Sequence, residues 1–177
     1  MTTGDELIIS AMKENQENGF RLLMAKYKKP VYWHIRRLVV SHSDAQDAAQ
    51  ETFVRVFRSF DRFRSKSSFS AWIYRIATNE ALRLLDRRKK ERCPLDGADT
   101  STLAADDPVD YTDLEAVRLQ KAILSLPTKQ QVTFNLRYYD ELEYDEIAAI
   151  TDSTATGAKA NYHTAKDKIV QYMNSND

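Results

Sequence analysis

Apolar residues recur along this chain at the three- and four-residue spacing of helices, and no stretch alternates apolar and polar positions over a strand's length. In the first half, apolar stripes predict helices that include residues 7–11, 20–27, 31–39 and 48–57. Pro30 is expected to open the third of these, because proline fits the first turn of a helix. Asp44 is expected to cap the fourth. The pattern as a whole predicts an all-α protein.

A helix of uneven composition is predicted within residues 67–92, which read SSFSAWIYRIATNEALRLLDRRKKER. Ser68 is a suitable N-cap, and the segment before it, 60–67, is expected to be a polar loop. Three apolar residues are expected in the core by their helical spacing, namely Phe69, Ile73 and Ile76. Trp72 is expected to be exposed. Aromatic residues at the start and a basic run at the end indicate a surface that contacts something both aromatic and anionic.

The second half of the chain also shows helical spacing. Asp113 is expected to cap its first helix, and Pro127 to occupy the first position of the next one. A short helix around 144–150, a polar turn and a longer helix then form a helix-turn-helix pattern, which many simple helical hairpins share. The residues expected to face inward on the first and the last helix are Leu114, Val117, Ile123 and Leu124, and Ala158, Tyr162, Ala165 and Ile169.

The net charge of zero conceals a strong segregation of charge along the chain. Residues 1–92 carry 19 Lys and Arg against 11 Asp and Glu, residues 93–113 carry six acids and no base, and residues 114–177 carry seven bases and nine acids. The acidic segment has few large apolar residues, so it cannot offset the entropy of ordering. We therefore expect two small helical domains, 1–92 and 113–177, joined by a flexible acidic linker at 93–112. A long loop within one domain is the alternative, although loops of that length are uncommon.

The motifs of common enzymes are missing from the sequence. It has no glycine-rich phosphate loop, no HExxH, no GxSxG and no paired CxxC. The histidines at 34, 42 and 163 are far apart and are expected to be surface or half-buried residues. Asp44, Asp47 and Glu51 lie on neighbouring turns and suggest an acid/base pair or a cation site, but a solvated face or a protein-binding patch fits them better. We expect no catalysis, no metal and no cofactor.

Several features favour the cytoplasm. No run approaches 18 apolar residues, so no membrane insertion is expected. The N-terminus is acidic and amphipathic, unlike a secretion signal. Cys93 is the single cysteine, which excludes an internal disulfide and suits a reducing compartment.

Three stretches resemble one family. DAQDAAQETFVRVF at 44–57 and FDRFRSKSSFSAWIYRIATNEALRLLDRRKK at 60–90 resemble region 2 of bacterial sigma factors, and residues 126–169 resemble region 4. The short chain without an intervening domain resembles the extracytoplasmic-function (ECF) class. The resemblance implies a non-enzymatic factor that binds the clamp and flap regions of core RNA polymerase and directs it to promoters. It also implies that an anti-sigma factor is a possible partner.

The resemblance assigns region 2 to the polymerase and to the −10 element, which is read as single-stranded DNA. Single strands suit aromatic rings that stack on bases and cations that follow phosphates. The expected polymerase-binding residues are Asp44, Asp47, Gln50 and Glu51. The expected −10 contacts are Phe63, Arg64, Lys66 and Ser67 in the loop that receives a flipped base, Trp72 as a stack or wedge, Arg75 and Asn79 as polar contacts, and Arg83, Arg87, Arg88, Lys89 and Lys90 on the backbone.

Region 4 is expected to read the −35 element as duplex through its last helix. The outward-facing residues are Thr156, Lys159, Ala160, Asn161, His163 and Lys166. Many relatives carry an Arg at the position of Asn161 and a Gly at that of Asp152, so this helix is less cationic than theirs. Phosphate neutralisation supplies most non-specific affinity. We therefore expect the free protein to bind promoter duplex poorly and to gain affinity when polymerase holds both modules.

Two other classes of protein remain open from the sequence. A stand-alone helix-turn-helix regulator would explain the C-terminal module, with the basic module serving dimerisation or effector binding. The chain could also be a helical interaction protein without a DNA role, in which the basic run is simply a solvated helix face. Binding to core polymerase discriminates the sigma factor from both.

Overall fold

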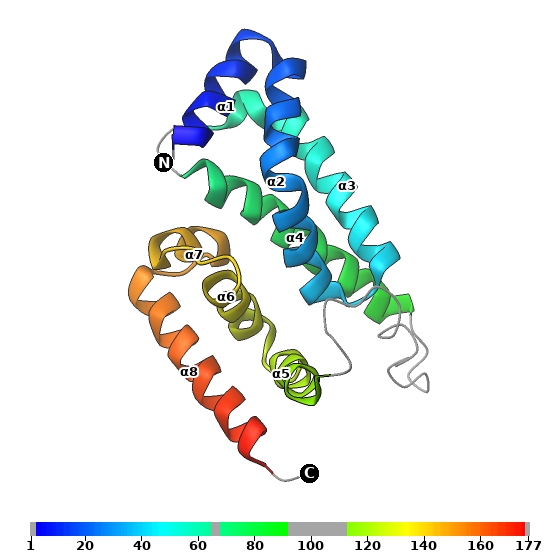
Figure 1. Cartoon of the computed structure of the whole chain (residues 1–177), viewed down its shortest axis with the longest axis vertical. Helices are drawn as coiled ribbons and strands as arrows, with labels where there is room; N and C mark the ends of the chain where they lie inside the picture. Colours follow the sequence, from blue (N-terminus) through cyan, green and yellow to red (C-terminus); the bar gives the residue numbers. More distant parts are fainter. Residues whose placement is uncertain (1–2, 65–67, 92–112, 176–177) are drawn as a thin grey trace.

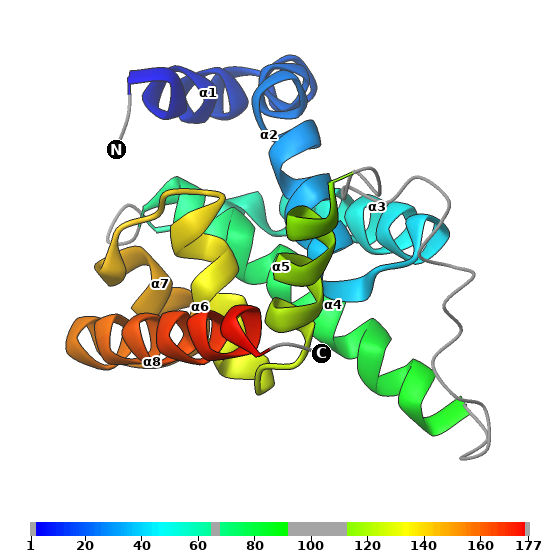
Figure 2. The ribbon, with the colours of Figure 1, turned by 60° about the horizontal axis from the view of Figure 1, so that its bottom comes forward.

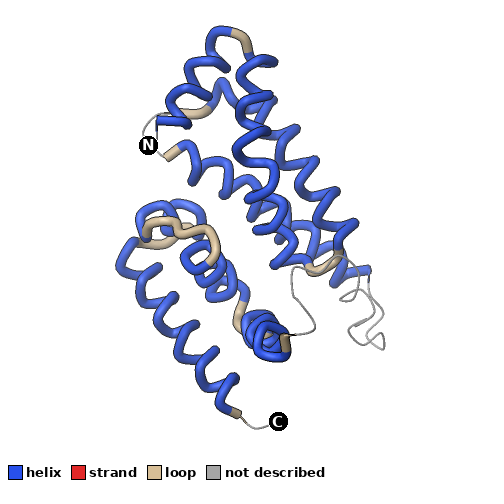
Figure 3. The backbone as a smooth tube through the Cα atoms, in the orientation of Figure 1, coloured by secondary structure: helices blue, strands red, loops and turns tan. Residues whose placement is uncertain are grey.

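The computed structural model of the chain describes residues 3–64, 68–91 and 113–175. In these ranges every regular element is a helix, which confirms the all-α prediction (Figure 3). The helices are α1 (Thr3–Glu14), α2 (Gln16–Val39), α3 (His42–Ser59), the 3₁₀ helix η1 (Phe60–Arg62), α4 (Phe69–Glu91), α5 (Leu114–Leu124), α6 (Thr128–Tyr138), α7 (Tyr144–Thr151) and α8 (Ala155–Asn174). The expected linker at 93–112 lies outside the described residues.

The helices form two groups that lie side by side, α1–α4 and α5–α8 (Figure 1). Within the first group α1 packs on α2, and α2, α3 and α4 pack on one another. Within the second, α8 packs on α5, α6 and α7. The C-terminal turns of α4 project away from both groups (Figure 2). We call the groups the N-terminal and C-terminal modules.

The prediction that Pro30 opens a new helix is wrong, because Pro30 lies inside the single helix α2. A proline in a helix interior removes a hydrogen bond and costs about 3 kcal/mol. Here Tyr27 and Val31, on either side of it, are buried, and Ile35 continues the same stripe. Pro30 itself is exposed. Packing of the whole apolar stripe against α3 and α4 therefore outweighs the local cost.

The cap of α3 also differs from the prediction. Ser41 is the N-cap, and its hydroxyl accepts a hydrogen bond from the backbone N–H of Asp44 at 3.4 Å. Asp44 therefore lies in the first turn, where the helix dipole favours a carboxylate. The predicted caps Ser68 and Asp113 are confirmed, since Ser68 accepts from Ala71 N–H at 3.2 Å and Asp113 from two backbone N–H groups of α5.

The start of α4 is more buried than the sequence indicated. Phe69 and Ile73 are fully buried as predicted, while Ile76 is only half-buried. The expected exposure of Trp72 is wrong in part, because this side chain is half-buried against the core. The preceding segment is not a wholly polar loop, since Phe60 also packs against the core and begins η1.

The helix-turn-helix prediction corresponds to α7, a turn and α8. Asp152 ends α7 in the left-handed conformation, with φ 53° and ψ 50°. Thr154 caps α8 by accepting from Gly157 N–H at 3.0 Å. The inward residues Ala158, Ala165 and Ile169 are buried, while Tyr162 is half-buried.

Two details of the C-terminal module depart from the prediction. Leu114 is 75% exposed, because it stands at the first position of α5, away from the packed face. Val117 and Leu124 are only half-buried, and Ile123 is buried. Pro127 is the N-cap of α6 rather than its first helical residue, a shift of one position.

The two modules share one hydrophobic core. Six buried residues of the C-terminal module belong to the same cluster as the buried residues of α2 and α4, namely Val132, Leu136, Leu142, Ile147, Ile150 and Ala158. Helix α7 packs on α4, and α6 packs on α2. Apolar burial therefore holds the modules together, and this arrangement determines which side chains of α4 face solvent.

Candidate functional site

An aromatic cluster lies at the beginning of α4. The indole of Trp72 stacks on the ring of Phe69 at 5.7 Å between centroids, and Phe63 lies 5.2 Å from both. Phe69 is buried and supports the other two, which remain half-exposed. The structure therefore brings together two of the residues predicted for the −10 contact. Arg64 lies beside them and is exposed, and the predicted contacts Lys66 and Ser67 fall outside the described residues.

The next turns of α4 carry the predicted polar contacts Arg75 and Asn79, both exposed. The guanidinium of Arg75 lies 3.1 Å from the carboxylate of Asp152 in the turn between α7 and α8. Two more polar contacts join the modules here: Ser68 Oγ donates to Glu146 at 2.8 Å, and Tyr74 OH donates to Asp140 at 3.0 Å. The C-terminal module thus places carboxylates along this part of α4.

The basic end of α4 is exposed but largely paired with acids. Arg83 binds Glu80 at 2.7 Å, Arg88 binds Asp44 at 2.7 Å, and Lys90 lies 3.3 Å from Asp86. The predicted backbone contacts Arg87 and Lys89 are exposed as well. Hydrogen bonding and charge attraction from Asp44 raise the pKa of Arg88 above its ordinary value. The end of α4 therefore presents a cationic surface in which several charges already have partners.

The predicted polymerase-binding residues lie on α3, but they differ in how far they are exposed to solvent. Asp47, Gln50 and Glu51 are exposed. The Asp44 side chain is only 14% exposed, because it is the partner of Arg88. Glu51 lies 3.3 Å from Arg55 one turn later. Three of the four predicted residues are thus available at the surface of the free chain.

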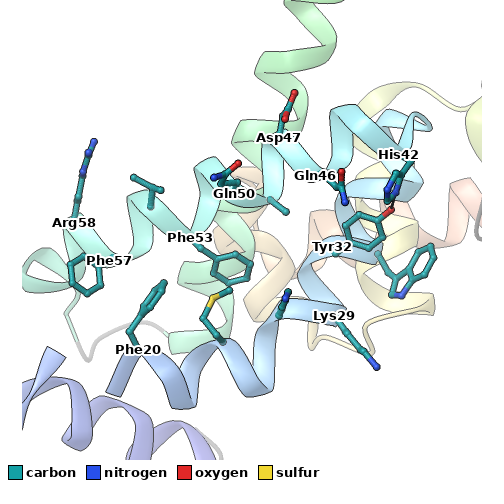
Figure 4. Close-up of a pocket in the computed structure, with 15 residues that line it drawn as sticks. Phe20, Lys29, Tyr32, His42, Gln46, Asp47, Gln50, Phe53, Phe57 and Arg58 are labelled. Carbon is teal, nitrogen blue, oxygen red and sulfur yellow. Dashed lines mark hydrogen bonds between the residues drawn. The ribbon is translucent and has the colours of Figure 1, made fainter. Parts of the chain in front are cut away.

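A groove of about 1460 Å³ runs between α2 and α3 and was not predicted from the sequence (Figure 4). The rings of Phe20, Phe53 and Phe57 lie between the two helices, and Phe20 meets Phe57 edge to face at 5.1 Å. Asp47 and Gln50 also line the groove. The remaining lining residues are Met24, Lys28, Lys29, Tyr32, Trp33, His42, Gln46, Ala49, Val54 and Arg58. This surface can take an amphipathic partner, with apolar groups in the groove and polar groups at its edges.

Helix α8 presents the surface predicted for duplex DNA. Of the predicted residues, Thr156, Lys159, Ala160, His163 and Lys166 are exposed. Asn161 is half-buried, because it lies one turn after the buried Ala158 and beside the packed stripe of α8. The helix thus shows an exposed, weakly cationic face from Thr156 to Lys166.

Comparisons with known proteins agree with this arrangement. A model of sigma-70 region 2 matches residues 23–91, and a model of sigma-70 region 4 matches residues 116–169. The chain belongs to the sigma-70 family. It is 28% identical over 176 residues to the ECF RNA polymerase sigma-E factor of Salmonella typhimurium, covering 93% of this chain and 92% of that protein. It is 29% identical over 173 residues to the ECF RNA polymerase sigma factor SigW of Bacillus subtilis, with 91% and 92% covered.

Two solved structures have the same fold. One is CnrH in complex with the cytosolic domain of CnrY, with a TM-score of 0.76 at 18% identity, covering 98% of this chain and 99% of that chain. The other is the sigma factor RpoE in complex with the anti-sigma factor NepR from Bartonella quintana, with a TM-score of 0.69 at 20% identity and 89% and 98% covered. The two family models and the two ECF relatives make the chain a sigma factor of the ECF group, and the prediction of promoter-specific initiation with core RNA polymerase is confirmed. The stand-alone regulator is not favoured, because the region 2 match accounts for α4.

The boundary between regions 2 and 4 contains a buried polar cluster. Nε2 of His34 lies 2.8 Å from the Thr78 hydroxyl, and Nδ1 lies 3.6 Å from the Asp140 carboxylate. Burial lowers the pKa of His34 to about 3 and raises that of Asp140 to about 6. The hydrogen bond from Tyr74 and the charge of Arg37 partly oppose the rise at Asp140. His34 is completely buried, so its expected surface or half-buried position is wrong.

Sequence reasoning missed the residues that join the two regions. Tyr74 and Asp140 are 66 positions apart, and the guanidinium of Arg37 stacks over the ring of Tyr139 at 4.0 Å. Helical spacing reveals which face of a helix is apolar but not which distant helix covers it. In the described part of the chain, no helix is long and apolar enough to cross a membrane, and no cluster of three potential metal ligands occurs.

Proposed function

We propose that this sigma factor docks on core RNA polymerase through α3 and the α2–α3 groove, opens the −10 element with α4, and reads the −35 element with α8. The observation that carries the proposal is the half-exposed pair of Phe63, which follows η1, and Trp72 in the first turn of α4, together with the exposed cationic end of α4. The proposal retains the division into domains 1–92 and 113–177 with a linker at 93–112.

The polymerase-binding surface combines charge and apolar area. Asp47, Gln50 and Glu51 offer acidic and polar groups, and the rings of Phe20 and Phe57 offer apolar contacts in the groove. Interfaces commonly have such an aromatic centre with a polar rim. A part of the polymerase clamp that brings basic groups to Asp47 and Glu51 and apolar groups to the groove is the partner that fits this surface.

The −10 surface matches the needs of base flipping. Extruding a base costs a few kcal/mol, and stacking one base on an aromatic ring returns roughly 1–3 kcal/mol. Phe63 and Trp72 provide two neighbouring aromatic surfaces, and Arg75 and Asn79 supply polar contacts on the following turns. The exposed Arg87 and Lys89 lie further along α4, where they can follow the phosphates.

The −35 surface is weakly cationic. Lys159 and Lys166 are its two lysines, and His163 and Thr156 add further polar groups. Asn161 can pair with an adenine edge only through the part of its side chain that remains exposed. Because few phosphates are neutralised, we expect promoter duplex to bind tightly only when polymerase holds both regions. Tight, sequence-specific binding of duplex by the free chain would contradict this expectation.

The remaining aspects of the proposal follow from the sigma-factor role. The chain contributes no catalytic group, since polymerase performs the chemistry of RNA synthesis, and the cytoplasm is the compartment in which it acts. CnrH, which has the same fold, has been solved with the cytosolic domain of CnrY, and the sigma factor RpoE, which also has it, with the anti-sigma factor NepR. We propose that a protein of this inhibitory class also binds this chain and competes with polymerase.

The experiment is multi-template transcription in vitro. Core polymerase freed of other sigma factors is incubated with fragmented genomic DNA, with and without the chain, and transcript starts are mapped. Discrete starts are expected only when the chain is present. Trp72→Ala should reduce them roughly five- to a hundredfold, the equivalent of one lost base stack, while Tyr172→Ala near the end of α8 serves as the aromatic control. Absence of both core binding and new starts would contradict the proposal.

A further inference from the structure

An ion pair joins a residue of the proposed polymerase surface to a residue of the proposed DNA surface. Asp44 of α3 accepts a hydrogen bond from the Arg88 guanidinium of α4 at 2.7 Å. The carboxylate is 14% exposed and the guanidinium side chain 47% exposed. Glu91 lies 3.4 Å from the other terminal nitrogen of Arg88. In the free chain, Arg88 is therefore held against α3 instead of being presented fully to DNA.

A second connection runs parallel to the first. Glu51 of α3 lies 3.3 Å from Arg55, Arg55 lies 2.6 Å from Glu80 of α4, and Glu80 lies 2.7 Å from Arg83. The Glu80 side chain is 8% exposed, so its charge is shared between two guanidinium groups in a nearly buried position. We call the Asp44–Arg88 pair and the Glu51–Arg55–Glu80–Arg83 chain the α3–α4 seam.

The seam is accessible to a partner. A polar pocket of about 360 Å³ opens between α3 and α4, and Asp47 lines it together with Glu51 and Arg55 from α3. Glu80, Arg83 and Arg87 line it from α4. A basic side chain that docks on α3 can therefore approach Glu51 and Glu80 through this pocket, while Asp44 lies outside it and keeps 14% of its side chain exposed.

We propose that the α3–α4 seam couples polymerase binding to DNA binding by exchange of ion-pair partners. In the free chain Asp44 of α3 holds Arg88, and Glu80 of α4, which Arg55 of α3 also contacts, holds Arg83. A basic group of polymerase that binds Asp44 weakens the hold on Arg88. A basic group that binds Glu51 releases Arg55 to Glu80, which weakens the hold on Arg83. Both arginines then become available to DNA phosphates.

This inference rests on the proposed function, because it requires α3 to face polymerase and α4 to face DNA. The coupling is reciprocal, so DNA bound to α4 strengthens the binding of polymerase to α3 by the same factor. Exposed and partly exposed ion pairs of this kind correspond to changes of about two- to fivefold in affinity. The seam therefore changes the affinity for DNA and for polymerase by a small factor, and it does not prevent either from binding.

The test measures binding of the full-length free chain to a dye-labelled single-stranded oligodeoxynucleotide of random sequence, at several salt concentrations. Asp44→Asn should bind about two- to fivefold more tightly than wild type. Its salt dependence should steepen by about 0.7, because one more cation reaches a phosphate on single-stranded DNA. Glu14→Gln, which removes an equal charge from the exposed end of α1, is the control and should change neither quantity to this extent.

The double variant isolates the pair. In a background of Arg88→Gln, the substitution Asp44→Asn should give no gain beyond that of the control. If Asp44→Asn proves unfolded by circular dichroism, Arg88→Gln alone carries the test. It should cost the free chain less than about twofold in affinity for the oligonucleotide, but cost the complex with core polymerase about two- to fivefold.

The proposal is overturned if Asp44→Asn binds the oligonucleotide no more tightly than Glu14→Gln, or if its gain in affinity persists in the Arg88→Gln background. It is also overturned if Arg88→Gln lowers the DNA affinity of the free chain and of the polymerase complex equally. Transcription by the wild-type holoenzyme separates this failure from failure of the function. Discrete starts without the coupling would remove only the seam proposal, whereas absence of starts and of core binding would remove the proposed function itself.

Discussion

Arg75 of α4 and Asp152 of the α7–α8 turn form an ion pair of 3.1 Å that joins region 2 to region 4. The side chains are 49% and 79% exposed, so the pair contributes at most about 1 kcal/mol. The pair matters because of where it lies: it engages Arg75, which we assign to contact with the −10 DNA. For Arg75 to contact DNA this pair has to open, together with the Ser68–Glu146 hydrogen bond beside it.

The backbone of Asp152 gives a first prediction. Its φ of 53° lies in the left-handed region, which Gly adopts without steric cost and Asp tolerates. Asp152→Val should lower the unfolding free energy by roughly 1–2 kcal/mol, since a β-branched side chain clashes in this conformation. Asp152→Gly should leave it nearly unchanged. Urea denaturation of both variants checks this, and equal destabilisation by Gly and Val would contradict it.

Gly19 gives a second prediction, with Gly4 as its matched control. A Cβ on Gly19 would lie 2.3 Å from the backbone nitrogen of Met12, so Gly19→Ala forces α1 away from α2. Despite the better helix propensity of Ala, we expect a loss of about 1–3 kcal/mol in unfolding free energy. A Cβ on Gly4 would meet only the Lys26 ammonium at 3.6 Å, so Gly4→Ala should not destabilise the protein. Thermal unfolding that ranks the two in the opposite order would contradict the close approach.

Asp140 gives a prediction about pH. Its pKa rises to about 6 in the folded chain from an ordinary 3.8, so the folded state favours the protonated acid. Its contribution to stability is therefore fully present below pH 3.8 and is lost as the pH rises through about 6. The difference in unfolding free energy between wild type and Asp140→Asn should fall by about 3 kcal/mol across this window.

The comparison with Asp140→Asn is needed because His34 acts in the opposite direction. Its pKa is lowered to about 3, so its contribution is lost as the pH falls below its ordinary value of 6.5. Denaturant titrations of both proteins at several pH values separate the two effects. A difference between them that stays constant from pH 4 to pH 7 would contradict the assignment to Asp140.

The polymerase surface gives a fourth prediction. Asp47 is exposed and lines the α2–α3 groove, so Asp47→Lys should weaken binding to core polymerase roughly fivefold without altering the folded structure. Glu17→Lys on the exposed start of α2 makes the same charge change outside the assigned surface and should have a smaller effect. Competition against a labelled sigma factor measures both affinities, and equal weakening would argue against the α3 surface.

Local signals in the sequence were sufficient for much of the fold. Ser68 and Asp113 cap helices as expected, because capping depends on a side chain and the backbone only two or three residues away. The helix-turn-helix was predicted from another local signal, the helical spacing of the apolar residues Ala158, Ala165 and Ile169. Phe63 and Trp72 were each predicted as −10 contacts, which stays a prediction, but their contact with each other and with Phe69 was not expected.

The failures of sequence reasoning have non-local causes. Pro30 is tolerated inside α2 because two other helices pack on that stripe, which no local rule includes. The assignment of Asp44 to polymerase stays a prediction, but its ion pair with Arg88 was missed, because the two residues are 44 positions apart. His34 gave no sign of burial, because its burial depends on packing between helices far apart in the sequence.

The most direct measurement of the central claim is permanganate reactivity of thymines in the −10 stretch of a promoter identified by the transcription experiment. With core polymerase and the wild-type chain, thymines in this stretch should become reactive as the strands separate. Trp72→Ala should bind core polymerase as tightly as wild type but lose most of this reactivity, because the supporting stack at the start of α4 is gone. Reactivity equal to wild type with Trp72→Ala would show that the aromatic pair of α4 does not open the promoter.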